Sequence, residues 1–284
     1  MPLYHLMQGL FRIYPISNLT AIALLLFSAF LILYLISAYD FISVRTFLPS
    51  NIYVLIVCGF VSLLNLHPVY FGAVFLLLSL SQLFTAFNES LNYNNAFNAG
   101  FFLGVGTLFY APLFFFFLIL PAGFTIWSTN REWRFTVLSV LGAFLPLFFA
   151  FSYYFFIDST VLFREIIDLN ILYPNDLLFD LPLKIYLGFL ILIFSISSLF
   201  IIGHFGSKTV SEQKFFQVFF FIFIIAFLLL LVIPAVSFEI FVILAIPVTF
   251  LLSNYLIYIK RKTWGDIFMI AIIGFVIYMH LACL

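Results

Sequence analysis

Long stretches of apolar residues, separated by short polar segments, fill most of the chain. These stretches are continuous and do not alternate every second residue, so they predict helices and not the strands of a barrel. A helix of roughly 20 apolar residues crosses the ~30 Å hydrocarbon core of a bilayer. The pattern predicts an all-α polytopic transmembrane bundle that forms a single integral membrane domain over residues 1–284. The apolar stretches are Leu19–Ala38, Ser50–Leu66, Val69–Phe87, Phe97–Trp127, Phe135–Phe156, Leu183–Gly203, Phe215–Ile233, Glu239–Ile259 and Trp264–Leu284.

The stretch Phe97–Trp127 decides the number of spans. As one helix its 31 residues would be about 46 Å long, more than the hydrocarbon core requires. Ala111 and Pro112 interrupt it near the middle, and proline breaks or bends a helix. We therefore expect a hairpin of two short helices, 97–110 and 112–127, and about ten membrane helices in all. One uninterrupted helix, and nine spans, is the alternative.

Glycines precede the expected break at positions 100, 104 and 106. Small residues at such spacing let a partner helix approach closely. They predict a tight helix contact on this segment.

The distribution of Lys and Arg predicts the orientation. With ten spans, eight cations lie on one side and three on the other, and cytoplasmic loops carry the excess of positive charge. Nine spans also divide the cations eight to three. Both counts put the loop 157–182 on the exterior side of the membrane. We expect that membrane to be a bacterial cytoplasmic (inner) membrane.

The loop 157–182 is the longest polar segment, and it holds five of the eleven acidic residues. Within it, Val161–Ile171 has apolar residues at roughly helical spacing and polar ones on the other side. This arrangement is typical of an amphipathic helix lying on a membrane surface. Tyr173 and Phe179 could anchor it.

Composition excludes several classes of protein. With 66% hydrophobic and 8% charged residues, the chain has too few polar side chains to cover a soluble globule. Acidic and basic residues are equal in number, eleven each, so there is no basic surface for nucleic acid. The sequence also lacks a phosphate-binding Walker loop, a Gly-x-Ser-x-Gly motif and a Cys-x-x-Cys pair.

The carboxylates of the loop are the candidate chemical groups. Glu165, Asp168 and Asp176, together with Glu239, could act as acid and base or bind a divalent metal such as Mg²⁺ or Mn²⁺. Arg164 is the candidate for binding a phosphate in a substrate. The plainer interpretation is that these residues only solvate an exterior connector.

Four histidines, at positions 5, 67, 204 and 280, raise the hypothesis of an iron site in an isoprenoid or carotenoid oxygenase. No two of them are spaced i, i+4, and ten spans put His204 on the opposite side from the others. We expect them to be turn and interface residues.

Four segments carry a resemblance to known families. RTFLPS (45–50), NLHP (65–68), FNAGFFLGVGTLFYAP (97–112) and REWRFTVLSVLGAFLP (131–146) resemble an uncharacterised bacterial family of polytopic membrane proteins, known as a domain of unknown function. The glycine-rich hairpin and the Arg-Glu-Trp corner are also similar to the central helices of lipid-dependent glycosyltransferases of the GT-C type.

The second resemblance implies an enzyme that acts on a lipid-linked glycan, but one feature departs from it. GT-C enzymes carry an essential acidic residue in a large exterior loop after the first span. Here only Leu19–Ala38 precedes the similar region, and Asp40 falls on the cytoplasmic side. Members of the uncharacterised family begin with one more helix, so we expect Met1 to be a late start.

The sequence therefore leaves three functions open. The favoured one is a non-catalytic membrane subunit of the cell envelope that presents the loop 157–182 to another envelope protein. The alternative is a GT-C-like glycosyltransferase or a transporter that handles a lipid-linked glycan, and the remote alternative is the iron-dependent oxygenase.

Overall fold

The computed structural model describes residues 14–39, 41, 42, 44, 46–59, 66–88, 92–124, 133–172, 181–259 and 262–282. Within these ranges the chain forms helices and no strands. The α-helices are α2 (Tyr14–Ala38), α3 (Leu48–Cys58), α4 (Pro68–Asn88), α5 (Tyr93–Phe109), α6 (Ile119–Ala122), α7 (Trp133–Phe156), α8 (Thr160–Ile171), α9 (Leu181–Gly203), α10 (Val210–Val232), α11 (Phe241–Tyr258) and α12 (Lys262–Ala282). Short 3₁₀ helices are η2 (Ala111–Leu118), η4 (Phe205–Ser207) and η5 (Phe238–Ile240).

The lengths and composition of these helices are those of a membrane protein. Within the described ranges, six helical segments are long and apolar enough to cross a bilayer. They are Ser17–Ala38, Pro68–Ala86, Trp133–Phe156, Leu181–Gly203, Val210–Val232 and Phe238–Tyr258, and three shorter apolar segments are Leu48–Cys58, Ala111–Ala122 and Gly265–Leu281. The predicted all-helical membrane architecture is thus confirmed at this level.

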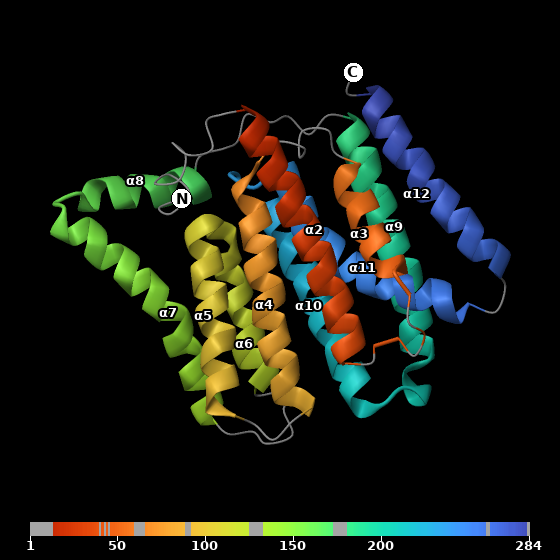
Figure 1. Cartoon of the computed structure of the whole chain (residues 1–284), viewed down its shortest axis with the longest axis horizontal. Coiled ribbons are helices and arrows are strands. Elements are labelled where there is room, and N and C mark those ends of the chain that lie inside the picture. Colours follow the sequence, from red (N-terminus) through yellow and green to blue (C-terminus); the bar gives the residue numbers. More distant parts are fainter. Residues whose placement is uncertain are drawn as a thin grey trace.

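Successive helices of the bundle alternate in direction (Figure 1). α2 descends in that view, α3 rises, α4 descends and α5 rises, and the alternation continues to α12. α8 differs, because it lies across the upper end of the bundle, next to the upper end of α7. This upper end corresponds to the predicted exterior side.

The predicted interruption of the stretch 97–127 is present, but the second part is the 3₁₀ helix η2 followed by the short helix α6, and residues 125–127 lie outside the described residues. α5 ends at Phe109, Tyr110 adopts an extended backbone (φ −135°, ψ 98°), and η2 begins at Ala111. The direction of α7 supports the reversal: Tyr93 stacks on Phe135 with ring centroids 4.8 Å apart near the start of both helices. α5 and α7 therefore run in the same direction, so the segment between them must return to the starting end.

Glycines set the distance between α5 and α7. A Cβ atom at Gly100 would overlap the backbone carbonyl of Ser139 and lie 2.9 Å from the backbone nitrogen of Ala143. Gly104 faces Ala143 in the same way, and Gly142 brings α7 against the backbone of α5. The predicted close contact is present for two of the three glycines. Gly106 instead faces α4, where its Cβ would lie 3.0 Å from that of Phe75.

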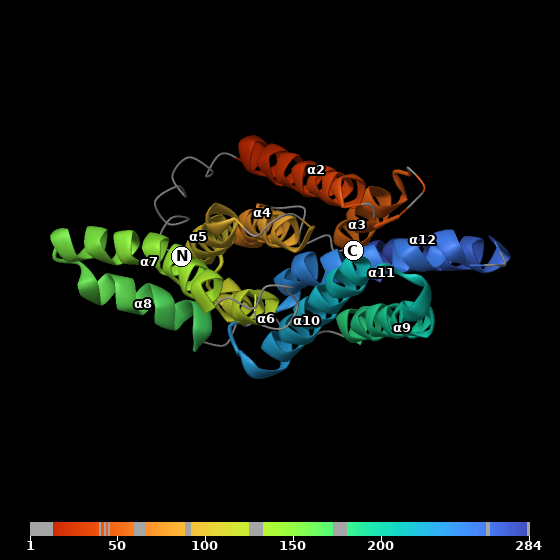
Figure 2. The same ribbon diagram turned by 90° about the horizontal axis from the view of Figure 1, so that it is seen from below.

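α11 is the central helix of the bundle. Every residue from Phe241 to Tyr255 is buried, and the helix contacts α3, α4, α9 and α10. Seen from below, it passes between α2, α3 and α4 on one side and α9 and α10 on the other (Figure 2). A helix that is apolar on all sides and enclosed in this way forms the core around which the others pack.

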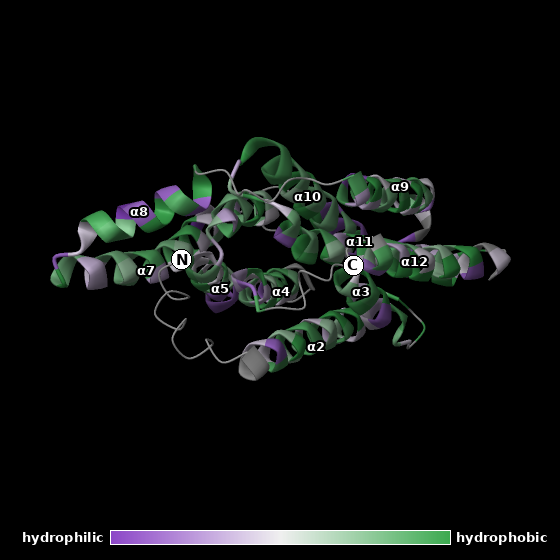
Figure 3. Cartoon of the chain, turned by 90° about the horizontal axis from the view of Figure 1, so that it is seen from above, coloured by the Kyte–Doolittle hydropathy of each residue, from purple (hydrophilic) through white to green (hydrophobic). Residues whose placement is uncertain are grey.

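The outer surface is apolar as well. On α7, Phe148, Phe149 and Phe156 are exposed to 64%, 62% and 83%, which would be unfavourable in water. α8 differs, because hydrophilic residues occur along it while α7 beside it is largely hydrophobic (Figure 3). This distribution fits hydrocarbon around the sides of the bundle and a polar medium above α8.

Several helices begin earlier than their hydropathy predicted, and side-chain caps account for two of these starts. α5 begins at Tyr93, within the expected connector, because the Asn92 side chain accepts a hydrogen bond from the backbone N–H of Asn94. α10 begins at Val210, five residues before the apolar stretch, where the Thr209 hydroxyl accepts from the N–H of Glu212. Both starts are capped by side chains, which apolar periodicity does not report.

Candidate functional site

The predicted amphipathic helix is α8, and a sharp turn places it across the end of the bundle. Asp158 adopts a left-handed backbone conformation (φ 52°) between α7 and α8, which Asp tolerates better than most residues. The N–H of Ser159 then donates to the carbonyl of Tyr154. The turn reverses the chain, so that α8 packs on α7 and on η2.

α8 has one face against the bundle and one face outward. Phe163 contacts the rings of Phe151 and Tyr154, with centroid distances of 5.8 and 5.3 Å, and Ile166 is buried. Arg164 and Glu165 are exposed on the outer side. A helix is present at the expected position, Val161–Ile171, and begins one residue earlier; its place on a membrane surface stays a prediction.

The candidate polar residues fall into two separate groups. On α8, Arg164 forms an ion pair with Asp168 at 3.9 Å, and the two side chains are 86% and 40% exposed; Glu165 is exposed beside them. Glu239 instead lies in η5 and is only 3% exposed. Asp176 lies outside the described residues. The roles assigned to these residues stay predictions.

Glu239 belongs to a buried polar cluster that we define as Glu239, Ser237, His67 and Tyr110. The backbone N–H of Ser237 donates to one carboxylate oxygen at 3.1 Å, and the Ser237 hydroxyl donates to the other. The rings of His67 and Tyr110 meet edge to face at 6.4 Å. The Tyr110 hydroxyl is buried and has no hydrogen-bond partner in the described part of the chain.

Three proline-marked interruptions of the chain bring this cluster together. His67 precedes Pro68 at the start of α4, Tyr110 stands at the break before Pro112, and Glu239 follows the turn after Pro234. Proline favours the first turn of a helix and disfavours its interior. All three interruptions lie at the upper end of the bundle, where α8 also lies (Figure 1).

Burial in the cluster favours the neutral form of His67. Burial lowers the pKa of His67, and the nearby Glu239 carboxylate opposes that shift only in part. The N–H of Val69 donates to Nδ1 at 3.3 Å, so the neutral ring carries its proton on Nε2. Burial and, secondarily, Glu239 raise the pKa of Tyr110. The cluster therefore places two further donors, His67 and Tyr110, near a carboxylate that already accepts from Ser237.

Sequence reasoning did not select Tyr110, and it considered His67 only as an iron ligand and as a turn or interface residue, not as a neighbour of Glu239. The available signal was their position next to Pro68 and Pro112, since residues at helix interruptions lie where backbone and side-chain polar groups gather. Nothing in the sequence pattern showed that the two positions are neighbours in space.

The histidines of the iron hypothesis do not converge in the described part of the chain. His204, just after α9, and His280 in α12 each bond through Nδ1 to the carbonyl four residues earlier. His204 follows the lower end of α9, whereas His67 precedes the upper end of α4 (Figure 1). Among the described residues no three His, Cys, Asp or Glu side chains are grouped as metal ligands would be. His5 lies outside those residues.

Comparisons with known proteins give one match. The model of a family described as "Family of unknown function (DUF6427)" matches residues 3–283. No curated protein and no solved structure matches the chain. The predicted resemblance to an uncharacterised family is confirmed, whereas similarity to GT-C glycosyltransferases stays a prediction.

Proposed function

The chain belongs to the DUF6427 family, whose function is unknown, and we propose that it is a non-catalytic multi-pass component of the bacterial cell envelope in the cytoplasmic membrane. Its role is to present α8 at the outer surface of that membrane to another envelope protein. The observation that carries this proposal is the geometry of α8, with one face fixed on the bundle and Arg164, Glu165 and Asp168 on or near the other.

Ten membrane crossings are part of this proposal. The six long segments and three shorter ones, together with α5, give ten passes that alternate in direction (Figure 1). α3, α5 and the segment Ala111–Ala122 are short for a crossing, but each packs against several neighbouring helices. Where other parts of the protein surround it, a helix can be shorter than the hydrocarbon thickness, because its ends do not meet lipid.

Cysteine labelling tests the orientation. In a background with Cys58 and Cys283 replaced by serine, we expect Glu165→Cys to react with an impermeant maleimide added outside intact cells. Val210→Cys, at the exposed start of α10 at the other end, should react only after the membrane is permeabilised. Reaction of both variants from the same side would contradict the proposed topology.

The outer face of α8 supplies the functional test. The triple variant Arg164→Ala, Glu165→Ala, Asp168→Ala should fold normally, because these side chains are exposed and exposed ion pairs contribute only about 0–1 kcal/mol. We expect it not to restore the phenotype of a deletion strain. Asp266→Ala, an exposed acid on α12, serves as the control and should restore it. Full complementation by the triple variant at wild-type protein levels would contradict the proposal.

The buried cluster favours a second candidate function. An ionisable residue buried at the end of a membrane bundle is costly and commonly functional. Glu239, with two neutral donors beside it, supports the alternative of an enzyme or transporter for a lipid-linked glycan. The Glu239→Gln variant described in the Discussion separates the two candidates.

A further inference from the structure

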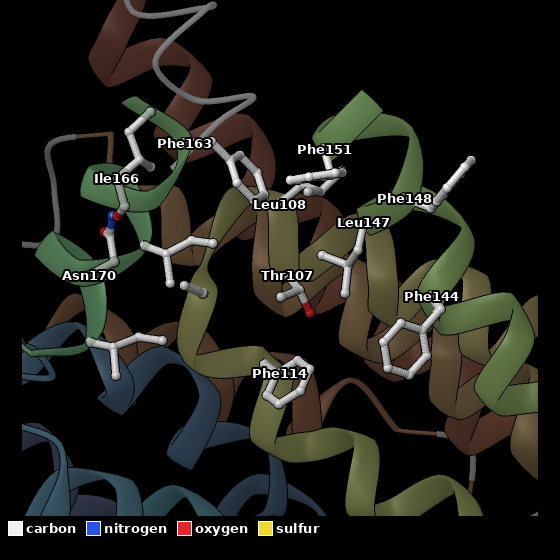
Figure 4. A pocket seen from close by; sticks show the side chains of 13 residues that line it. Thr107, Leu108, Phe114, Phe144, Leu147, Phe148, Phe151, Phe163, Ile166 and Asn170 are labelled. Atoms are coloured by element: carbon white, nitrogen blue, oxygen red, sulfur yellow. The ribbon is translucent and has the colours of Figure 1, made fainter. Parts of the chain in front are cut away.

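A pocket of about 480 Å³ lies beneath α8. Four elements form it: Thr107 and Leu108 from α5, Phe114 from η2, a row of phenylalanines from α7, and Ile166 and Asn170 from α8 (Figure 4). Its volume is within the roughly 300–1,000 Å³ of ordinary ligand sites. Nothing in the proposed role of α8 requires this space.

The pocket arises where α7 leaves α5. The two helices touch backbone to backbone at Gly100 and Gly142. Further along, Thr107 and Leu147 replace the glycines and face the pocket from opposite sides (Figure 4). α8 then closes the upper end through the contact of Phe163 with Phe151. The pocket is therefore a consequence of the helix arrangement.

The lining offers almost nothing to a polar molecule. Thr107 and Asn170 are the polar side chains among the lining residues. The Thr107 hydroxyl donates to the carbonyl of Leu103, and the Asn170 amide donates to that of Ile166. A polar ligand would lose its hydrogen bonds to water without replacement. This loss costs about 1–3 kcal/mol for each polar group of the ligand.

The size excludes a helix of another protein as the occupant. A helix is about 10 Å across with its side chains, so 480 Å³ accommodates a length of about 6 Å, roughly one turn. A narrow flexible chain fits such a space. The α7 side of the pocket faces outward, because Phe144 and Phe148 are 53% and 64% exposed.

The level of the pocket identifies the source of that chain. An amphipathic surface helix lies about 5–10 Å deep, at the boundary between head groups and acyl chains. A pocket directly beneath it is at the level where acyl chains begin. The exposed Arg164 on α8 can pair bidentately with a phosphate at head-group level.

We propose that the pocket beneath α8 binds one acyl chain of a membrane phospholipid, which enters from the bilayer past α7 and leaves its head group beside α8. Binding is favourable because the acyl chain makes van der Waals contacts with the lining residues. Apolar atoms that face a void lack those contacts. This inference rests on the membrane placement of α8 in the proposed function, but not on which side α8 faces or on its partner.

Photolabelling of the full-length protein in nanodiscs tests the proposal. The probe is a phosphatidylglycerol with a diazirine in one acyl chain, and labelled peptides are mapped by mass spectrometry. We expect labelling concentrated on pocket residues of α5, η2 and α8. Ala111→Phe, which fills the pocket, should reduce that labelling at least five-fold, whereas Leu199→Phe on the exposed face of α9 should not change it.

Ile167→Trp, on α8, fills the same pocket from the other side and replaces Ala111→Phe if that variant does not fold. Labelling spread evenly over the exposed helices, or unchanged by a folded pocket-filling variant, would overturn the proposal. Preferential labelling by a diazirine polyprenyl phosphate, with phosphatidylglycerol unable to compete, would also overturn it. If the triple variant of α8 restored the phenotype of the deletion strain, the proposed function would fail, but the expected labelling of the pocket would not change.

Discussion

Alanine at Gly100 is expected to cost the protein about 3 kcal/mol or more of unfolding free energy, the upper end of overpacking effects. The added methyl group would overlap the carbonyl of Ser139, which is backbone and cannot turn aside as a side chain can. α5 and α7 would have to separate along their whole contact. We expect a lower midpoint in sodium dodecyl sulfate titration and a lower melting temperature in detergent.

Gly188→Ala is the matched control. Gly188 lies in α9, and a Cβ there meets no atom within 4 Å. Because alanine is a better helix former than glycine by about 1 kcal/mol, this variant should be as stable as the wild type or slightly more so. Equal stability of the two alanine variants would show that the α5–α7 contact is not as close as the structure has it.

Alanine at Glu239 is expected to destabilise the protein by about 1–3 kcal/mol, the usual cost of leaving a buried donor unpaired. The carboxylate accepts from both the N–H and the hydroxyl of Ser237. It also lies in the first turn of η5 at the start of α11, where negative charge is favourable. Glu239→Gln keeps one acceptor oxygen, so we expect a smaller loss of unfolding free energy than for Glu239→Ala. Thermal unfolding in detergent measures the stability of both variants.

Glu212→Ala is the control for this prediction. Glu212 pairs with Lys208 at 3.8 Å, and the two side chains are only 24% and 11% exposed. We expect a smaller loss than for Glu239, because the Lys208 ammonium keeps its contacts with the rings of Phe216 and Tyr258. Equal destabilisation by Glu212→Ala and Glu239→Ala would contradict the importance of the buried cluster. Complementation adds a second result: a folded Glu239→Gln protein that fails to complement would favour the lipid-linked glycan alternative over a non-catalytic role.

The sequence predicted those features that depend on a few neighbouring residues. The break at Tyr110 follows from the local geometry of Pro112, and α8 follows from a segment with a clear polar side. Both could be located to within a residue or so. The helix starts at Asn92 and Thr209 are also local, and capping patterns would have given them.

The candidate site could be predicted only in part. Arg164 and Asp168 are four residues apart on one helix, so their proximity is a property of the sequence. Glu239 was selected because it is an acid near the end of a span. Its neighbours His67 and Tyr110 are far from it in the chain, and only the arrangement of α4, α5 and α11 brings the three together.

By itself, the sequence determined that the protein is an all-helical membrane bundle, that the helix breaks at Pro112, and that an amphipathic helix follows α7. Only the tertiary structure decided that Gly100 packs on α7 while Gly106 faces α4, that α11 is central, and that a pocket lies beneath α8. The physical reason is that lipid is as apolar as a protein core. Apolar residues on a membrane helix therefore do not reveal which side meets a neighbour, and long-range packing alone makes that choice.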